Sequence, residues 1–288
     1  MSNCFDSPYN FEWMLLVGDA SLDSMGTHKI KNTTNWLSYA SWTWEILRRN
    51  PDYISYYKAL RNKGFETVSH GNNHTLIKAK QHYPTANKFG LLAPADPTKY
   101  AGDQAVFWCP KAFANVVRFH VIDPASINRK NKPIQLSKMK GEKTHFLDAE
   151  GTYHIRILGE QFWFQLQCDS IEFVADDAYL GFELNNIGSP EKRFETIKQI
   201  GGIYDGSIAP DSGLHVPARL ENHLKSTLAY DIRTAGGSIT DVVNAFIEAG
   251  LVTVDPDKYI DFKDVAQNAY RAAKAYITGD YFKILNRQ

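Results

Sequence analysis

The chain has 288 residues and carries 32 basic and 32 acidic side chains, so its formal net charge is zero. Apolar residues make up 43% and aromatic residues 13%, which excludes a disordered chain and predicts a globular protein of one large or two ordinary domains. No stretch approaches the roughly eighteen apolar residues of a membrane span, and three scattered cysteines argue against a disulfide framework. We therefore expect a cytoplasmic protein, and the N-terminus, which lacks a basic start, predicts no signal peptide.

The zero net charge conceals three blocks of different balance. Residues 1–144 carry a net charge of +8, residues 145–216 carry −8, and residues 217–288 contain nine bases and nine acids. Such a division predicts different surroundings for each block, with ordinary fluctuation of surface charge as the alternative.

The N-terminal part is predicted to be an irregular arm followed by two helices. Residues 1–35 show little periodicity, whereas apolar residues from Trp36 onward recur at helical spacing up to the break at Asn50-Pro51. Proline suits the first turn of the next helix, which we expect to reach about residue 60. The aromatic side chains of 41–57, "SWTWEILRRNPDYISYY", fall on the inner faces of these helices and predict a helical hairpin with an aromatic seam.

The middle of the chain is predicted to hold little regular structure before residue 114. Residues 65–88 are polar and predict a loop, in which His70 and His74 would be solvated; a zinc pair is the alternative, but the intervening "GNN" opposes the helix it needs. Residues 114–122 predict a strand. The segment 129–143 predicts a basic linker, with phosphate contacts as the alternative role, for which the candidate residues are Arg129, Lys130 and Lys132.

From residue 144 the apolar period changes to two and then to the helical period. Short alternating runs up to about residue 184 predict a small antiparallel sheet, followed by a helix that starts at Ser189-Pro190 and ends at Gly201-Gly202. Three further helices are predicted over 217–237, 238–250 and 261–277, in the layout of a helix-turn-helix module. The expected fold class is α+β, with domains at 36–128 and 144–288 joined by the linker 129–143; the second divides into 144–214 and 215–288.

Enzymatic motifs are absent from the sequence. There is no phosphate-binding glycine loop, no dinucleotide fingerprint, no HExxH and no GxSxG. We therefore expect no catalytic residues, no cofactor and no metal.

The last predicted helix is the most informative segment for function. Lys263, Gln267, Arg271 and Lys274 recur at a spacing that places them on one helical face, with Asn268 beside them and Lys258 shortly before the helix. Such side chains can bind base edges or phosphates of DNA. The alternative is an ordinary solvated amphipathic helix, and the spacing alone does not choose between them.

Two parts of the chain resemble known regulators. The phrase "WEILRRNPDY", followed by "FGLLAPADP" and "AVFW", resembles the N-terminal transcriptional-regulator-like domain of proteobacterial regulators. The second half resembles the RovC-type DNA-binding domain in "THFLDAEGTYHIRI", "STLAYDIRTAGGSITDVVNAFI" and "AYRAAKAYITGDYFKIL". Together the matching stretches cover 36–60, 89–125 and 144–288.

This resemblance implies a RovC-type transcription factor of the type VI secretion regulator family. Its expected partners are promoter DNA, RNA polymerase and further copies of the same chain in a homo-oligomer, a hexamer, that activates type VI secretion genes. A non-enzymatic protein-interaction module is the alternative: an antiactivator or adaptor in a mobile-element or secretion circuit.

Overall fold

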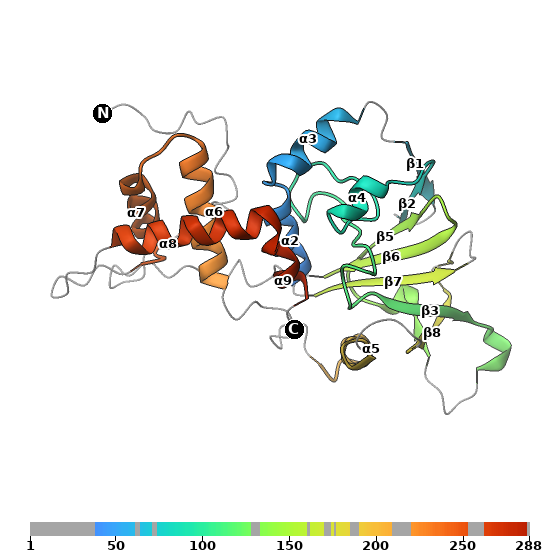
Figure 1. Cartoon of the computed structure of the whole chain (residues 1–288). Helices are drawn as coiled ribbons and strands as arrows, with labels where there is room; N and C mark the ends of the chain where they lie inside the picture. The colour runs from blue at the N-terminus through green and yellow to red at the C-terminus, as the bar shows by residue number, and fades with distance from the viewer. Residues whose placement is uncertain are drawn as a thin grey trace. The chain divides into compact units, whose positions relative to one another are not determined.

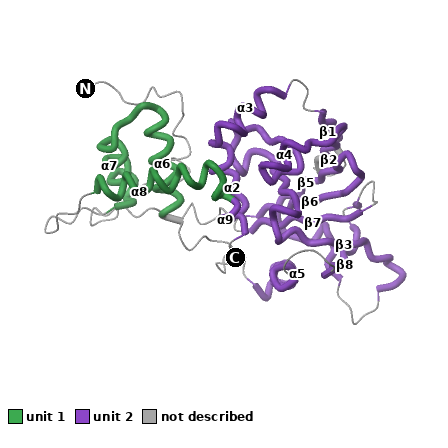
Figure 2. The backbone as a smooth tube through the Cα atoms, in the orientation of Figure 1, with its two compact units in different colours: residues 1–36, 216–281 green, residues 37–215, 282–288 purple. Residues whose placement is uncertain are grey.

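A computed structural model describes residues 38–60, 64–70, 74–127, 133–159, 162–169, 174–175, 177–184, 190–208, 220–252 and 262–286. Two compact units divide these residues (Figure 2). The sheet unit comprises Leu37–His215 and Phe282–Gln288, and the helical unit comprises Val216–Tyr281.

The sheet unit is built on one eight-stranded sheet (Figure 1). Its strands, in chain order, are β1 (Phe65–His70), β2 (His74–Ala79), β3 (Val117–Ile122), β4 (Ile134–Gln135), β5 (Glu142–Leu147), β6 (Thr152–Leu158), β7 (Trp163–Asp169) and β8 (Tyr179–Glu183). Hydrogen-bonded neighbours follow the order β1-β2-β5-β6-β7-β3-β8-β4. Strands β2 and β5 run parallel, as do β3 and β7, and the remaining pairs are antiparallel.

This sheet corrects two sequence-based expectations and confirms a mixture of helices and strands. The predicted sheet was small and antiparallel, whereas the observed sheet is large and mixed. Residues 65–88 were predicted to be a loop, but they contain the β1–β2 hairpin and the short helix α4 (Pro84–Lys88). His70 and His74 are Cα partners at the closed end of that hairpin. Strands on both sides of residue 144 join one sheet, so the sheet crosses the expected domain boundary.

One face of the sheet carries the apolar core. Alternate residues of the central strands, including Ile155 and Leu166, are buried there against α5 (Pro190–Asp205), which contributes Ile200 and Ile203. Helix α5 starts at Pro190 as expected. The expected end of this helix at Gly201-Gly202 is wrong, since the helix continues through both glycines to Asp205.

The opposite face is polar yet covered. Thr144, Arg156 and Gln165 are buried on it, and the segment 89–116 lies over them. Gln165 exchanges two hydrogen bonds with the backbone of Trp108, at 2.8 and 2.7 Å, and Arg156 donates to the Gln104 carbonyl at 2.7 Å. The buried side chains of Arg156 and Gln165 are thus paired with backbone groups of the covering loop. Those backbone groups are themselves covered and need hydrogen-bond partners.

The helices α2 (Tyr39–Leu47) and α3 (Pro51–Ala59) meet at Asn50, whose side chain caps α3. The expected aromatic seam is present: Trp44 and Tyr53 are buried and their rings meet edge to face at 5.8 Å. The Tyr53 hydroxyl donates to the Ala95 carbonyl at 2.6 Å, and Tyr53 also packs on Phe89. Both helices therefore pack on the segment that covers the sheet. Trp42, Trp44 and Tyr53 are core, whereas Tyr56 and Tyr57 are half-buried.

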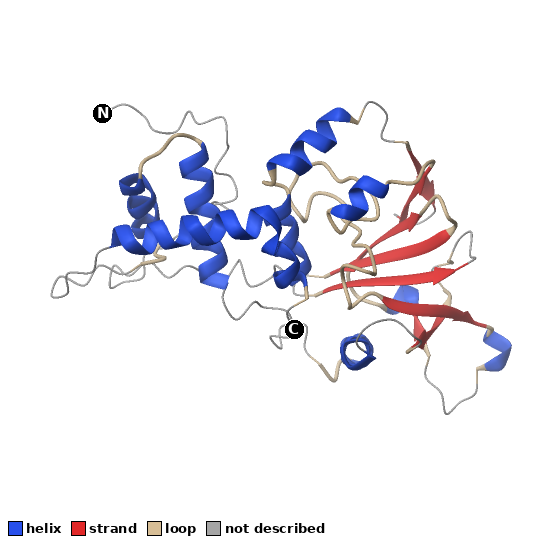
Figure 3. Cartoon of the chain, in the orientation of Figure 1, coloured by secondary structure: helices blue, strands red, loops and turns tan. Residues whose placement is uncertain are grey.

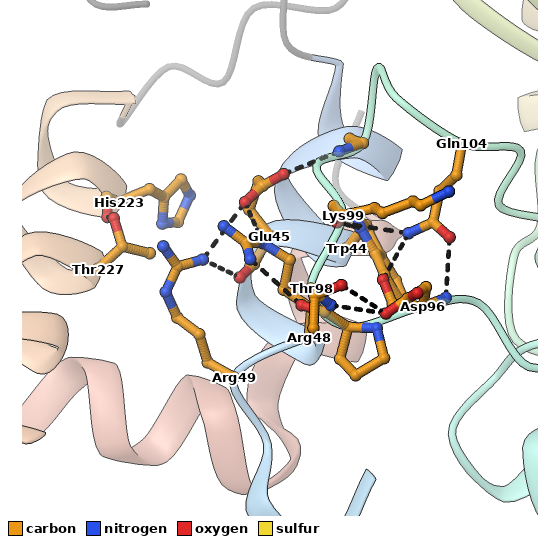
Figure 4. A network of polar contacts seen from close by, with 12 residues as sticks. Trp44, Glu45, Arg48, Arg49, Asp96, Thr98, Lys99, Gln104, His223 and Thr227 are labelled. Atoms are coloured by element: carbon orange, nitrogen blue, oxygen red, sulfur yellow. Dashed lines mark hydrogen bonds and ion pairs between the residues drawn. The ribbon is translucent and has the colours of Figure 1, made fainter. Parts of the chain in front are cut away.

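The polar edge of this packing centres on Glu45, as Figure 4 shows. The Glu45 carboxylate accepts hydrogen bonds from the Ala101 amide and from Arg48, while Arg49 lies 3.3 Å away. The Arg48 guanidinium also lies over the Tyr100 ring, 4.6 Å from its centroid. These arginines are occupied within the fold.

The helical unit contains α6 (Leu220–Thr234), α7 (Ile239–Glu248) and α8 (Phe262–Ala275), drawn in blue in Figure 3. A π-helical turn (Tyr276–Asp280) continues α8 into α9 (Tyr281–Leu285). Among the described residues, no helix combines the length and apolar character that crossing a bilayer requires.

Candidate nucleic-acid interface

The three helices of the helical unit pack into a bundle. Their buried side chains are Leu224, Leu228, Ala229 and Ile232 of α6, Val242 and Phe246 of α7, and Ala266 and Ala273 of α8. Alanines on the buried side of α8 allow a close approach of α6 and α8. The Ser238 hydroxyl and the Asp241 carboxylate form a capping box at the start of α7, as Ser238 predicted.

Helix α8 presents its predicted polar face to solvent. Lys263, Gln267, Asn268, Arg271 and Lys274 are all exposed. The buried side of the helix carries Ala266 and Ala273. The structure therefore gathers these five candidates on the outer surface of one helix.

Two interactions order the C-terminal half of this surface. Arg271 Nη1 donates to Asn268 Oδ1 at 3.3 Å. Lys274 Nζ lies over the Tyr270 ring, 4.9 Å from its centroid. Both cations are held by neutral groups, so each keeps its charge available to an anion.

Two further residues join this surface from α6. The Arg233 guanidinium lies 5.7 Å from the centroid of the Tyr270 ring, and Tyr230 packs beside the same ring at 6.4 Å. Arg233 also donates to the Gly237 carbonyl at 2.6 Å. Sequence reasoning missed these residues, because only the packing of α6 on α8 brings them to Tyr270.

The connections between the helices differ from the expected layout. A helix-turn-helix places a three- to four-residue turn before its second helix. Residues 235–238 form such a connection before α7, whereas residues 249–261 separate α7 from α8. Helix α7 contains Asp241 and Glu248 and no basic residue. The use of α8 as the reading helix therefore stays a prediction that rests on its exposed side chains.

The other candidates cannot be placed. Lys258 lies outside the described residues, as do Arg129, Lys130 and Lys132 of the basic linker. Within the described part of the chain, no group of three or more histidine, cysteine or carboxylate side chains has the arrangement of a metal site.

Comparison with known proteins adds no assignment, since no protein-family model and no curated protein matches the chain.

Proposed function

We propose that the chain is a sequence-specific DNA-binding transcriptional regulator that uses the exposed face of α8. The single observation that carries this proposal is the set of five long polar side chains on that face, all exposed, on a helix whose other side is anchored in a bundle. A rigid helix with such a face suits the major groove, which admits one α-helix.

The five side chains on the exposed face of α8 fall into two groups, those that can bind base edges and those that can bind phosphates. Arg271 can donate two hydrogen bonds to a guanine edge, and Gln267 or Asn268 can pair with an adenine edge. Lys263 and Lys274 act as point charges toward phosphates, which position the protein without reading sequence. The resemblance to RovC-type factors supports activation of type VI secretion genes at a promoter, with RNA polymerase as a partner.

Affinity in this proposal depends on several copies acting together. Residues 217–288 contain nine bases and nine acids, and an isolated neutral module gains little from the phosphate backbone. A homo-oligomer, a hexamer by the resemblance, places several α8 faces on one DNA site and raises the effective concentration of each.

A protein-interaction module is the second candidate, because the same neutral balance fits a surface for another protein. An antiactivator or adaptor of this kind would form oligomers yet show no salt-sensitive DNA binding.

The test is a gel-shift titration on sites enriched from a random duplex pool. Arg271→Ala combined with Lys274→Ala is compared with Lys88→Ala combined with Lys198→Ala, which removes the same charge from exposed positions in the sheet unit. We expect the α8 variant to weaken binding at least about tenfold and to reduce the salt slope by about one for each phosphate that it no longer neutralises. Equal affinities of the two variants at moderate salt would show that α8 does not read DNA.

A further inference from the structure

A groove of about 930 Å³ opens on the polar face of the sheet, within the sheet unit. Its floor is formed by side chains near the ends of β5, β6 and β7, among them Phe146, His154 and Gln167. These three lie on the same face, because Phe146 pairs with His154 and His154 pairs with Gln167 in the strand register. The walls come from 79–83, 109–112 and the C-terminal residues Phe282 and Asn286.

The walls are held in place by hydrogen bonds. The Asn286 carboxamide donates to the Ala112 carbonyl at 2.8 Å and accepts from the Ala114 amide at 3.2 Å. The groove is therefore formed by the fold itself and has a volume typical of small-molecule sites.

Each of the three carboxylates that line the groove, Asp148, Glu150 and Asp169, lies beside a nitrogen atom of another side chain. His82 lies 3.1 Å from Glu150, His154 lies 3.4 Å from Asp148, and Arg118 forms an ion pair with Asp169. Lys111 also lines the groove, and it makes no ion pair with another described residue. The Lys111 ammonium can therefore meet an anionic group of a ligand.

Gln167 is a floor residue whose carboxamide is available to a ligand. Its side chain is only 6% exposed, yet among the described residues its carboxamide has no hydrogen-bond partner. Gln165, two residues earlier on the same face of β7, makes two hydrogen bonds to Trp108. Gln167 is not among the side chains with a fully enclosed, unpaired polar atom, so its carboxamide is open to the groove, whereas that of Gln165 is engaged by the covering segment.

A second buried group of the same floor has one ring nitrogen without a partner in the described structure. His154 is 1% exposed, and its Nδ1 atom has no partner in the described structure. The Asp148 carboxylate faces the other ring nitrogen, Nε2, at 3.4 Å. Two neighbouring floor residues thus have unused hydrogen-bonding capacity.

The geometry points to a binding site for a small organic anion that also carries hydroxyl or amino donors. Its donors meet the Gln167 carboxamide on the floor, and its anionic group meets the Lys111 ammonium. Asn87, which also lines the groove, adds a third polar partner. The site does not depend on DNA binding, so the two proposals can fail separately.

The first test needs no ligand and compares Gln167→Leu with Gln165→Leu. Leucine of similar size at 167 removes an amide that bonds no other described residue, so we expect an unchanged or higher melting temperature. Leucine at 165 leaves the Trp108 amide and carbonyl unpaired, and we expect a melting temperature lower by about 4 °C or more. A loss at Gln167→Leu as large as that at Gln165→Leu would make Gln167 a structural residue and overturn the proposal.

The second test measures binding by isothermal titration calorimetry with citrate, adenosine monophosphate and a hexose phosphate as probes, and with inorganic phosphate as the control. We expect at least one probe to bind with a submillimolar Kd and inorganic phosphate to bind about tenfold more weakly. Gln167→Leu and Lys111→Ala should each reduce that affinity at least about tenfold. The proposal fails if no probe binds at millimolar concentration, or if inorganic phosphate binds equally well. It also fails if the exposed substitution Lys111→Ala leaves the affinity unchanged.

Discussion

Replacing Glu45 by alanine should destabilise the sheet unit strongly. The side chain is 8% exposed and accepts from the Ala101 amide at 2.9 Å, which joins α2 to the covering segment. It also faces the Arg48 and Arg49 side chains, which are only 12% and 10% exposed. Removing one partner of a buried ion pair costs about 3–5 kcal/mol, and leaving the Ala101 amide without its acceptor adds to this cost.

Two other interactions of Arg48 reduce the expected loss of stability in Glu45→Ala. Arg48 keeps the Pro97 carbonyl at 3.3 Å and the face of the Tyr100 ring, so we expect a net destabilisation near the lower limit, about 3 kcal/mol. The matched control is Glu66→Ala, because Glu66 and Lys80 form a pair at 3.6 Å with side chains 53% and 62% exposed. Exposed pairs contribute less than about 1 kcal/mol.

Urea denaturation followed by tryptophan fluorescence measures both variants, and Trp42 and Trp44 of α2 report directly on the affected region. A free energy of unfolding for Glu45→Ala within about 1 kcal/mol of that of Glu66→Ala would refute the assignment of Glu45 as a buried centre of charge.

Two further predictions concern α5 and the β5–β6 turn. Gly201→Ala should stabilise α5 by about 0.5–1 kcal/mol, since no atom lies within 4 Å of the added Cβ. Gly202→Ala should destabilise α5, since its added Cβ would lie 2.3 Å from the Ile208 side chain. Thermal melts in which Gly202→Ala is the more stable of the two variants would contradict this packing. Burial raises the pKa of Asp148, but hydrogen bonds from His154 and from two backbone amides outweigh it and lower that pKa. Asp148 therefore contributes stability above its unfolded pKa of about 4, and this stability is lost as the pH falls through the lowered folded pKa. Urea midpoints of Asp148→Asn below about pH 4 should depend less on pH than those of the parent chain, and parallel profiles would count against this contribution.

The sequence revealed local structure better than long-range pairing. Period-two alternation identified the strands after residue 144, and Ser238 correctly marked the start of α7, because both signals lie in neighbouring residues. The β1–β2 hairpin was missed, since its six-residue strands mix polar and apolar residues without regular alternation and its closing segment lies between two histidines. The parallel pairings of β2 with β5 and of β3 with β7 join distant segments, and no local pattern encodes them.

In the candidate site, too, local spacing was predictable from the sequence and packing between helices was not. The spacing of Lys263, Gln267, Arg271 and Lys274 correctly predicted a shared exposed face, because helical periodicity alone determines it. The contribution of Arg233 through Tyr270 depends on how α6 packs on α8, which the spacing does not contain. Gln165 and Gln167 alternate identically in the sequence, and only the covering segment distinguishes their roles.

The structure brings some side chains of the first two charge blocks together. Arg118 and His82 of the basic block pair with Asp169 and Glu150 of the acidic block inside the sheet unit. These pairs offset part of the opposite charges within one compact unit, so the excess of bases in residues 1–144 is no measure of affinity for DNA. In the proposed function, the cations of α8 contribute to the salt dependence of DNA binding, multiplied by the number of copies on one site.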